Sequence, residues 1–331
     1  MSATTPEPPP FHNPLTAEEL DRPVYLGPLI DDNAEVTLRG AGVVTTRDPD
    51  GAVVVISSRI RDIPPTAKWM HCPFMGVDSL VGRLPDHIQL LTRTITGMPE
   101  RMASYVATMV WAERWKLHQF DLQQTDRKWV QLQPDLRERD PRGVVILGTG
   151  QVGSAAARAL HHDFPFIWGV SRSGAATAGF DLVVDMTSAL DGAVDSALPG
   201  STTTSLAWKQ VDTVVITFPR TPETTNLVSH QLLDALHDAH VILIGRGATM
   251  DFSALEAAVA SGSVRHATID VLPAEPAPPQ SWLWTEPRVT LTPHISGSTQ
   301  PSDLTTSFHD ARQALLTGAV PAGWVQLGAA Y

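Results

Sequence analysis

The second half of the chain alternates short apolar runs with segments of helical periodicity. The runs are rich in Val and Ile and bounded by Gly, Pro or polar residues, a pattern typical of buried strands. They are VVILG, FIWGVSR, DLVVDM, TVVITFP, HVILIGRG, VRHATIDV and RVTLTP. Between several of them lie the helical segments GSAAARALHH, SHQLLDALH and DFSALEAAVASG. This alternation predicts a parallel sheet covered by helices on both faces.

The pattern before residue 144 is less regular. Residues 1–14 are rich in Pro, Ser and Thr, which predicts an N-terminal segment that is either disordered or held down against the domain. Strands are predicted in PVYLGPL, GAVVVISSR and KWMHCPFMGVDSL, whereas residues 30–50 show no assignable pattern. Residues 97–124 show helical periodicity, with an apolar stripe that predicts one long helix bridging two domains; the stripe is Met102, Tyr105, Val106, Met109 and Val110.

A loop and an amphipathic helix follow His294, too late in the chain to join the predicted sheet. We therefore expect this helix to pack back on the N-terminal part. The smaller domain would then be discontinuous, residues 1–110 plus 296–331, with the domain of the predicted parallel sheet, residues 111–295, inserted in it.

Composition and charge narrow the function. A net charge of −11 argues against a nucleic-acid partner but not against a small anionic substrate, since a few local arginines outweigh the global field. Cys72 is the only cysteine, which favours a reducing, cytoplasmic location. We see no signal peptide and no apolar run of the length that spans a membrane, and so expect no membrane partner.

A dinucleotide-binding motif follows the strand VVIL. Gly148, Gly150 and Gly153 form G-x-G-x-x-G between that strand and the helical segment SAAARAL. The first glycine permits a tight turn, the second lets the backbone approach a pyrophosphate, and the third allows close helix packing. The predicted phosphate-binding segment also contains Thr149, Gln151 and Val152.

The next strand bears on the choice of cofactor. An acidic residue at its end would bind the adenosine ribose, but this strand ends in Ser171, Arg172 and Ser173. An arginine beside two hydroxyls suits a 2′-phosphate. We therefore predict NADPH first and NADH second; the alternative is that Arg172 is a solvated strand-end residue.

Three residues follow strands near the end of the chain: Arg246 in LIGRGATMD, Glu275 in IDVLPAEP and His294 in VTLTPHISG. Ligands of doubly wound sheets bind outside the carboxyl ends of the strands, so the three residues should share one site. A cation, a carboxylate–histidine pair and a nicotinamide are what reduction of a 2-keto acid by hydride transfer requires. The sequence therefore predicts an enzyme.

The chain resembles the D-isomer-specific 2-hydroxyacid dehydrogenases, and within them the bacterial glyoxylate/hydroxypyruvate reductase A type. The resemblance spans roughly residues 67–300, with the blocks in the family's order; the first 60 residues match poorly. The matching blocks are MGVDSL, TGMPERMASYVATMVW, ILGTGQVGS, VSRSG, TFPRTPETTNLV, LIGRGATMD, ATIDVLPAEPAPPQSWLWTEPRVTLTPHISGST and the closing Tyr331.

The resemblance implies a role for each residue of this trio. His294 would be the general acid that protonates the ketone oxygen, and Glu275 would hydrogen-bond its imidazole. A carboxylate within a few ångströms favours the protonated ring, so the two assignments agree. Arg246 would bind the substrate's carboxylate and carbonyl. His294 taken alone would be a surface histidine after a proline.

The resemblance also implies further contacts to the cofactor. Asp270 would accept a hydrogen bond from the nicotinamide carboxamide, or else merely cap the end of its strand. The backbone near Phe218 and Pro219 would pass beside the nicotinamide ribose, and Gly245, His294 and Ser296 complete the cofactor-binding set.

The backbone amides of Met75 and Gly76 would bind the substrate carboxylate. The family has small residues before this glycine, whereas Phe74 and Met75 are bulky, so the pocket is predicted to be narrowed or reshaped. Arg59 is either a second cation near the carboxylate or a solvated loop residue.

Five tryptophans and two pairs of histidines have less distinctive surroundings. We interpret Trp111, Trp115, Trp129, Trp282 and Trp284 as core or interface aromatics rather than as a lid over the substrate. The histidines at 161, 162, 237 and 240 lack accompanying ligands at metal-binding spacing. We expect them on helix surfaces and predict no metal site.

The sequence therefore predicts a doubly wound Rossmann nucleotide domain inserted in a smaller flavodoxin-like α/β substrate domain. The predicted function is NADPH-preferring reduction of glyoxylate and hydroxypyruvate by a homodimer, the assembly most common in the family. The alternatives are a dehydrogenase for a bulkier, more apolar 2-hydroxy acid and a nucleotide-sensing binding protein on the same scaffold.

Overall fold

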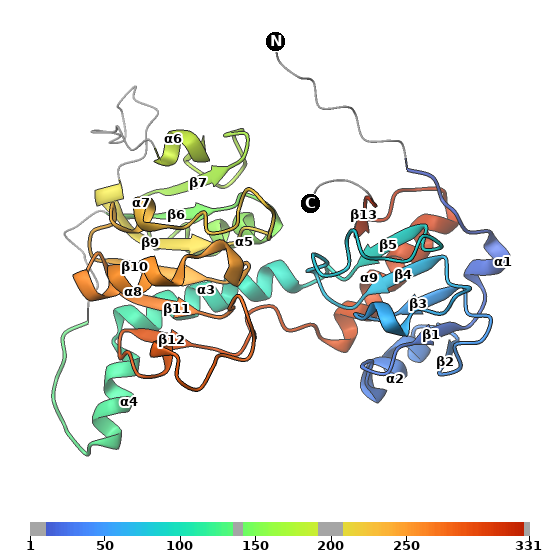
Figure 1. Ribbon diagram of the computed structural model, residues 1–331, viewed down its shortest axis with the longest axis horizontal. Helices are drawn as coiled ribbons and strands as arrows, with labels where there is room; N and C mark the ends of the chain where they lie inside the picture. Colours follow the sequence, from blue (N-terminus) through green and yellow to red (C-terminus); the bar gives the residue numbers. More distant parts are fainter. Residues whose placement is uncertain (1–10, 135–141, 191–207, 328–331) are drawn as a thin grey trace, which may run out of the picture. The chain divides into compact units, whose positions relative to one another are not determined.

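The computed structural model describes residues 11–134, 142–190 and 208–327, and these form two compact α/β units. The first unit runs to Met98 and resumes at Thr299, and the second extends from Pro99 to Ser298. Each unit is built around its own sheet (Figure 1).

The sheet of the first unit has the order β13-β5-β4-β3-β1-β2. All its pairings are parallel except that of β13 with β5. From β2 to β5 this is the flavodoxin-like order 2-1-3-4-5. Its elements are α1 (Ala17–Leu20), β1 (Val24–Leu26), α2 (Asp32–Gly40), β2 (Thr45–Thr46), β3 (Val54–Ile56), β4 (Trp69–Cys72), β5 (Leu90–Arg93), α9 (Pro301–Leu316) and β13 (Trp324–Val325).

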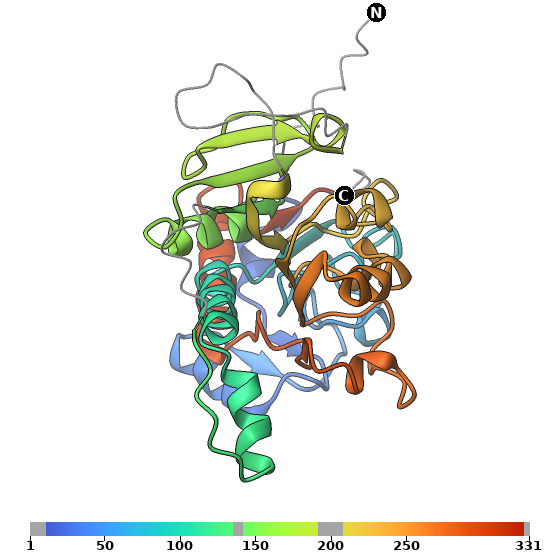
Figure 2. The ribbon, with the colours of Figure 1, turned by 90° about the vertical axis from the view of Figure 1, so that its left-hand side faces the viewer.

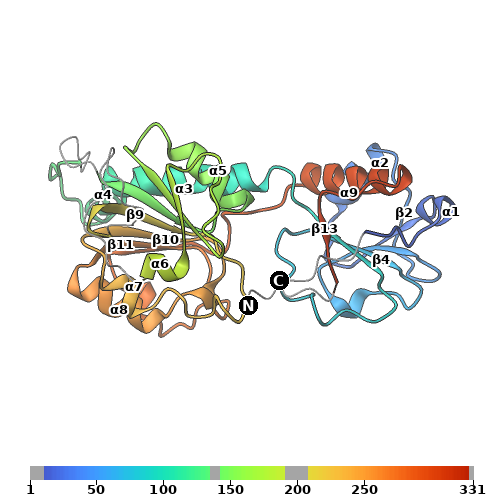
Figure 3. The ribbon, with the colours of Figure 1, turned by 90° about the horizontal axis from the view of Figure 1, so that it is seen from above.

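Helices α2 and α9 cover one face of this sheet, as Figure 3 shows, and loop residues such as Leu80 and Ile88 pack on the other face. Phe308 of α9 stacks on Trp69 of β4 with ring centroids 5.0 Å apart, and both side chains are fully buried. The helix after His294 therefore packs on N-terminal strands, as predicted, because its apolar face completes the core of this unit.

Residues 30–50, which showed no pattern, contain α2 and β2. Asp31 caps α2 by accepting a hydrogen bond from the amide of Ala34. The expected division at 110/111 falls inside helix α3 (Met98–Arg114), which packs within the second unit.

The second unit has a seven-stranded sheet in the order β12-β11-β10-β9-β6-β7-β8, with every pairing parallel. From β8 to β11 this is the Rossmann order 3-2-1-4-5-6, which confirms the predicted doubly wound fold. Its elements are α3, α4 (Leu117–Thr125), β6 (Gly143–Leu147), α5 (Gln151–Leu160), β7 (Ile167–Ser171), β8 (Leu182–Asp185), α6 (Met186–Leu190), β9 (Val211–Ile216), α7 (His230–Leu233), β10 (Ala239–Leu243), α8 (Phe252–Ser261), β11 (Val264–Ile269) and β12 (Val289–Leu291).

Helices cover both faces of this sheet (Figure 3). Alternate residues of β6 show why, since Val144 and Ile146 pack with α3 and α5, whereas Val145 and Leu147 pack with α7 and α8. Side chains of successive strand residues point to opposite faces, so a strand apolar throughout is buried on both.

The predicted long helix is broken. α3 ends at Arg114, and Lys116 adopts a left-handed conformation (φ 57°) before α4 begins. α4 projects away from the sheet of its own unit (Figures 1 and 2). The segment 115–130, here called the arm, exposes six large apolar side chains: Trp115, Leu117, Phe120, Leu122, Trp129 and Val130.

These exposures bear on the tryptophans, which were predicted to be core or interface aromatics. Trp129 is fully exposed, and Trp115 and Trp284 are about half exposed, so none of the three is a core residue in this chain.

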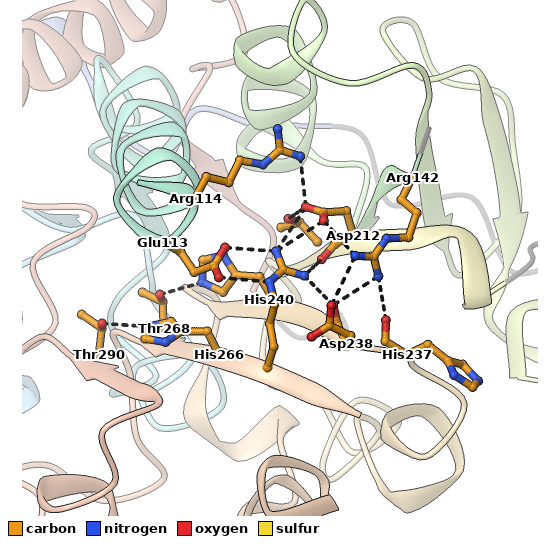
Figure 4. A network of polar contacts seen from close by, with 12 residues as sticks. Glu113, Arg114, Arg142, Asp212, His237, Asp238, His240, His266, Thr268 and Thr290 are labelled. Carbon is orange, nitrogen blue, oxygen red and sulfur yellow. Dashed lines mark hydrogen bonds and ion pairs between the residues drawn. The ribbon is translucent and has the colours of Figure 1, made fainter. Parts of the chain in front are cut away.

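A buried ionic network joins the amino ends of strands β9 and β11 to α3 (Figure 4). Asp212, fully buried, pairs with Arg114 at 3.2 Å and with Arg265 at 3.3 Å. Arg265 forms two hydrogen bonds of 3.0 Å to Glu113, and Arg142 joins the cluster through Asp212. This end of the sheet is opposite the carboxyl ends of the strands, which points to a structural role.

His240 was expected on a helix surface, but it lies fully buried on β10. Its Nε2 contacts the Thr268 hydroxyl at 2.9 Å, and His266 contacts Thr290 likewise (Figure 4). Burial lowers the pKa of His266 to about 3 and that of His240 well below its usual range, so both rings are neutral. The prediction for His240 was wrong because this residue belongs to a buried strand and not to a helix.

Candidate active site

The glycine motif forms a tight turn between β6 and α5. Gly148 has φ 110°, which only glycine adopts easily, and a Cβ there would lie 2.4 Å from the Thr217 hydroxyl. That hydroxyl lies 3.0 Å from the carbonyl oxygen of Leu147 and 3.1 Å from that of Gly148, and the one hydrogen shared between them holds the turn against β9. A Cβ on Gly153 would lie 1.8 Å from the Gly148 carbonyl oxygen, so close packing of α5 requires glycine.

Gly150 differs from the other two glycines because a Cβ built on it meets nothing within 4 Å. It is the N-cap of α5 and makes no side-chain cap. The first amides of a helix have no partners within the helix, and the helix dipole favours an anion beside them. The open space beside Gly150 and these amides fit a pyrophosphate. Thr149 lies in the turn, and Gln151, Val152 and Gly153 are the first residues of α5.

The residues predicted to select the cofactor, Ser171, Arg172 and Ser173, lie at the end of the neighbouring strand, β7. Ser171 is half-buried, and its hydroxyl accepts a hydrogen bond from the amide of Gly174. Arg172 and Ser173 are exposed. The pKa of the Glu223 carboxyl is lowered, mainly by hydrogen bonds from its own backbone amide and from Thr221. The nearby charge of Arg172 makes a smaller contribution in the same direction. An exposed guanidinium at this edge fits a phosphate ligand.

The ends of β9 and β10 lie against each other beyond the glycine turn. A Cβ on Gly245 would lie 2.6 Å from the carbonyl oxygen of Phe218, so the two backbones meet closely. Pro219, next along the chain, is exposed. Arg246 is half-buried, and its guanidinium donates to the carbonyl of Gly245 at 2.8 Å.

Asp270 stands at the end of β11 and is 2% exposed. Its carboxylate accepts hydrogen bonds from the Thr292 hydroxyl at 2.6 Å and from the amides of Ile295 and Ser296, both at 2.9 Å. Its carbonyl also accepts from the amide of His294. Asp270 therefore does more than cap its strand, because it anchors the whole segment 292–296, which we call the histidine loop.

His294 and Glu275 meet as predicted. His294 Nδ1 lies 2.9 Å from Glu275 Oε2, and the other carboxylate oxygen of Glu275 accepts from the amide of Leu272. Both side chains are partly exposed, 50% and 39%. Because an ionised carboxylate only accepts, Nδ1 donates to it and Nε2 is left for another partner. This is the geometry of a general acid oriented by a carboxylate.

The second unit thus brings Gly148, Gly150, Arg246, Glu275 and His294 to the carboxyl ends of its strands. An anion-binding turn, a cation and an oriented imidazole can together bind a dinucleotide and a carboxylate and transfer a proton. The roles of the individual residues stay predictions.

Met75 and Gly76 lie in the first unit, in the loop after β4, and both are half-buried. Arg93 donates a 3.0 Å hydrogen bond to the carbonyl of Met75 and so fixes this loop. Phe74 is 49% exposed. Arg59, left open between a second cation and a solvated residue, is paired with Asp62 at 2.9 Å.

Sequence reasoning missed two residues that hold the histidine loop. The hydroxyl of Tyr105 on α3 lies 2.6 Å from that of Thr292, and Arg101 donates at 2.8 Å to the carbonyl of Ser298. The apolar stripe predicted from the sequence includes Tyr105. That placement is correct for the ring but does not predict the contact of the hydroxyl.

No helix among the described residues is both long and apolar enough to cross a membrane. Nor do three or more His, Cys, Asp or Glu side chains gather there in a way that could hold a metal ion.

Comparisons with known proteins identify the family. The model of the NAD-binding domain of the D-isomer specific 2-hydroxyacid dehydrogenases matches residues 107–296. An uncharacterised protein from the mprR 3′ region of Streptomyces coelicolor is 32% identical over 292 residues, which are 86% of this chain and 97% of that protein.

Solved structures show the same fold. A D-isomer specific 2-hydroxyacid dehydrogenase of Xanthobacter autotrophicus, crystallised with NADPH and MES, is 25% identical with a TM-score of 0.75, covering 92% of this chain and 97% of that one. An NADPH-dependent glyoxylate/hydroxypyruvate reductase of Sinorhizobium meliloti, in complex with NADP and sulfate, is 23% identical with a TM-score of 0.76, covering 93% and 99%.

Proposed function

The chain belongs to the D-isomer specific 2-hydroxyacid dehydrogenases, a family of NAD(P)-dependent oxidoreductases, and we propose that it is an NADPH-preferring reductase of small 2-keto acids. Glyoxylate and hydroxypyruvate, reduced to glycolate and D-glycerate, are the substrates we propose. The observation that carries the proposal is the 2.9 Å contact between His294 Nδ1 and Glu275 Oε2 at the strand edge that also holds the glycine turn.

The chain's own residues would act as follows. Bound NADPH supplies the hydride. Protonated His294, oriented by Glu275, donates the Nε2 proton to the ketone oxygen as that oxygen gains charge. Arg246 binds the substrate carboxylate through charge-assisted hydrogen bonds and orients the carbonyl. Asp270 keeps His294 in place through the histidine loop and remains a proposed partner of the cofactor's carboxamide.

The preference for NADPH rests on the end of β7. Arg172 is exposed between two serines where an NAD-binding site would hold a carboxylate. The Xanthobacter dehydrogenase was crystallised with NADPH, which supports the same choice. NADH is the proposed second cofactor.

One observation favours a second substrate class. Phe74 is about half exposed and Met75 half-buried, in the loop proposed to bind the substrate carboxylate. Apolar side chains there would favour a bulkier, more apolar 2-keto acid. A nucleotide-sensing protein without catalysis is the alternative of a different class, and the paired His294 and Glu275 speak against it.

We also propose a homodimer in which the arm contributes to the interface. Six large apolar side chains exposed over residues 115–130 form a surface of the kind that a partner covers. The cytoplasmic location stays a prediction from Cys72, the single cysteine.

The experiment that tests the function is NADPH oxidation, followed at 340 nm, with glyoxylate, hydroxypyruvate, pyruvate and a branched 2-keto acid, repeated with NADH. We expect the two small polar acids and NADPH to give the highest kcat/KM. His294→Gln should lower kcat by roughly 10²–10⁴-fold and leave NADPH binding intact. Preference for the branched acid would replace glyoxylate with an apolar substrate, and tight NADPH binding without turnover would support the sensor.

A further inference from the structure

The histidine loop contains one residue in an unfavourable backbone conformation. His294 has φ 55°, the left-handed region that residues with a side chain avoid at a cost of roughly 1–2 kcal/mol. Four hydrogen bonds to Asp270 oppose that cost, from the amides of His294, Ile295 and Ser296 and from the hydroxyl of Thr292. Whatever fixes Asp270 and Thr292 therefore also fixes the imidazole.

The hydrogen-bond chain continues beyond Asp270 to another element. Thr292 carries a single hydroxyl hydrogen and donates it to Asp270 at 2.6 Å. Its oxygen is then the acceptor in the 2.6 Å contact with Tyr105, so the tyrosine donates. Burial raises the pKa of Tyr105 to about 12, and the phenol keeps its proton at any physiological pH.

Tyr105 stands on α3, one helical turn after Arg101, which holds the Ser298 carbonyl at 2.8 Å. Residues four apart on a helix share a face. One face of α3 therefore holds the histidine loop at two points, near its start through Thr292 and just beyond its end through Ser298.

We propose that Tyr105 is a positioning residue for catalysis, which acts through Thr292 and Asp270 to hold the His294 imidazole in its reactive place. The inference rests on the proposed function and deepens it. Tyr105 is not a catalytic residue in this scheme, because its hydroxyl is committed to Thr292 and His294 is reached only through the chain of hydrogen bonds.

The test compares Tyr105→Phe, which removes only the hydroxyl, with Thr108→Val, which removes an exposed hydroxyl from the same helix. Tyr105→Phe should lower kcat for glyoxylate on the order of tenfold, below the roughly hundredfold cost of moving a reacting group by about 1 Å. The KM for NADPH should stay within about twofold, since the glycine turn is untouched. Thr108→Val should leave both constants at their wild-type values.

Variants of Thr292 show whether kcat can be restored by a hydroxyl at that position and whether Thr292 and Tyr105 act through the same hydrogen bonds. Thr292→Val should lower kcat at least as much as Tyr105→Phe, and Thr292→Ser should restore it. The double variant with Tyr105→Phe and Thr292→Val should be no slower than Thr292→Val alone, because both changes break one chain.

A second readout does not depend on turnover. Amide hydrogen exchange at Ile295 and Ser296, both bonded to the Asp270 carboxylate, should be faster in Tyr105→Phe and unchanged in Thr108→Val. Unchanged exchange, or a kcat within twofold of wild type, overturns the proposal, as does an equal loss of NADPH binding, which would mark a merely structural role. A wild-type protein that reduces no 2-keto acid overturns the proposed function instead, and the exchange rates still decide whether Tyr105 holds the loop.

Discussion

At the scale of single residues, His294 shows a conflict between backbone preference and chemistry. Glycine or asparagine would adopt φ 55° more easily than histidine, yet an imidazole stands there beside Glu275. Local rules broken at one position, with hydrogen bonds arranged around it to compensate, are typical of functional sites. The backbone conformation of His294 is an observation independent of the sequence motifs, and it supports a functional role for the same residue.

Arg172 gives a prediction about the cofactor. Arg172→Ala should raise the KM for NADPH by about 10–100-fold, because a hydrogen bond to a charged group contributes roughly 1.5–3 kcal/mol. The KM for NADH should change by less than about twofold, since NADH lacks the 2′-phosphate. Steady-state kinetics with both cofactors is the measurement.

Arg158→Ala is the matched control for this prediction. Arg158 is an exposed arginine on α5, 3.6 Å from Glu100, and should affect neither cofactor. Equal effects of Arg172→Ala on NADPH and NADH would contradict a 2′-phosphate site at the end of β7.

The residues of the candidate site differ in how far the sequence reveals them. Arg246, Glu275 and His294 follow apolar strands in motifs with characteristic spacing, so their shared edge was predictable. Tyr105 and Thr292 were not, because a hydroxyl used across 187 residues of sequence leaves no local pattern. The anchoring of the histidine loop by Asp270 depends on backbone amides, which no sequence motif identifies.

At the scale of the elements, two glycines at the start of α5 are expected to have different roles, Gly150 in binding the cofactor and Gly153 in folding. Gly150→Ala should fold with a melting temperature close to wild type, since its φ of −71° suits alanine and its Cβ meets open space. It should nevertheless raise the Kd for NADPH by about tenfold or more, because the methyl group occupies the place of the pyrophosphate.

Gly153→Ala is the counterpart. Its Cβ would lie 1.8 Å from the Gly148 carbonyl oxygen, so α5 must shift and the melting temperature should fall. Calorimetry and NADPH fluorescence titration distinguish the two effects. NADPH binding by Gly150→Ala at wild-type affinity would show that the cofactor does not approach this turn.

The arm gives a prediction about assembly. Leu122 is 54% exposed on α4, and Leu122→Glu should shift the protein from dimer to monomer in sedimentation equilibrium, because a charge buried at an apolar interface is costly. Val36→Glu, at a 69% exposed position on α2, should leave the dimer intact. A wild-type protein that is monomeric at micromolar concentration would contradict the proposed homodimer.

The elements were predictable where the pattern is continuous. Strands β6, β9, β10 and β11 follow from runs apolar on both faces, whereas α2 was missed because its buried residues, Ala34 and Leu38, are too few to form a stripe. Nothing in the sequence marks the left-handed Lys116 that ends the predicted long helix. The network around Asp212 joins residues from four separate segments and only folding reveals it.

At the scale of the whole molecule, buried histidines predict acid sensitivity in both units. Burial lowers the pKa of His71 in the first unit and of His266 in the second to about 3, below the value of about 6.5 expected for the unfolded chain. Between these values the unfolded chain binds more protons. The stability that the neutral rings provide is thus complete above pH 6.5 and declines as the pH falls toward 3, by up to about 1.4 kcal/mol per pH unit and histidine.

Thermal unfolding between pH 7.5 and pH 5 measures this decline. His71→Gln should flatten the dependence of the melting temperature on pH, whereas His162→Gln, at an exposed position, should not. Parallel curves for wild type and His71→Gln would show that His71 does not titrate on unfolding.

The discontinuity of the first unit has a consequence for synthesis of the protein on the ribosome. Its strands β1 to β5 are translated first, yet α9, whose Phe308 covers Trp69, and the edge strand β13 are translated last. Helix α2, which shares that face with α9, is made early, so only the part of the nascent sheet that α9 covers stays exposed while the inserted unit is made and can fold. Chaperone binding to the N-terminal segment should be concentrated in that interval and end only when α9 leaves the exit tunnel.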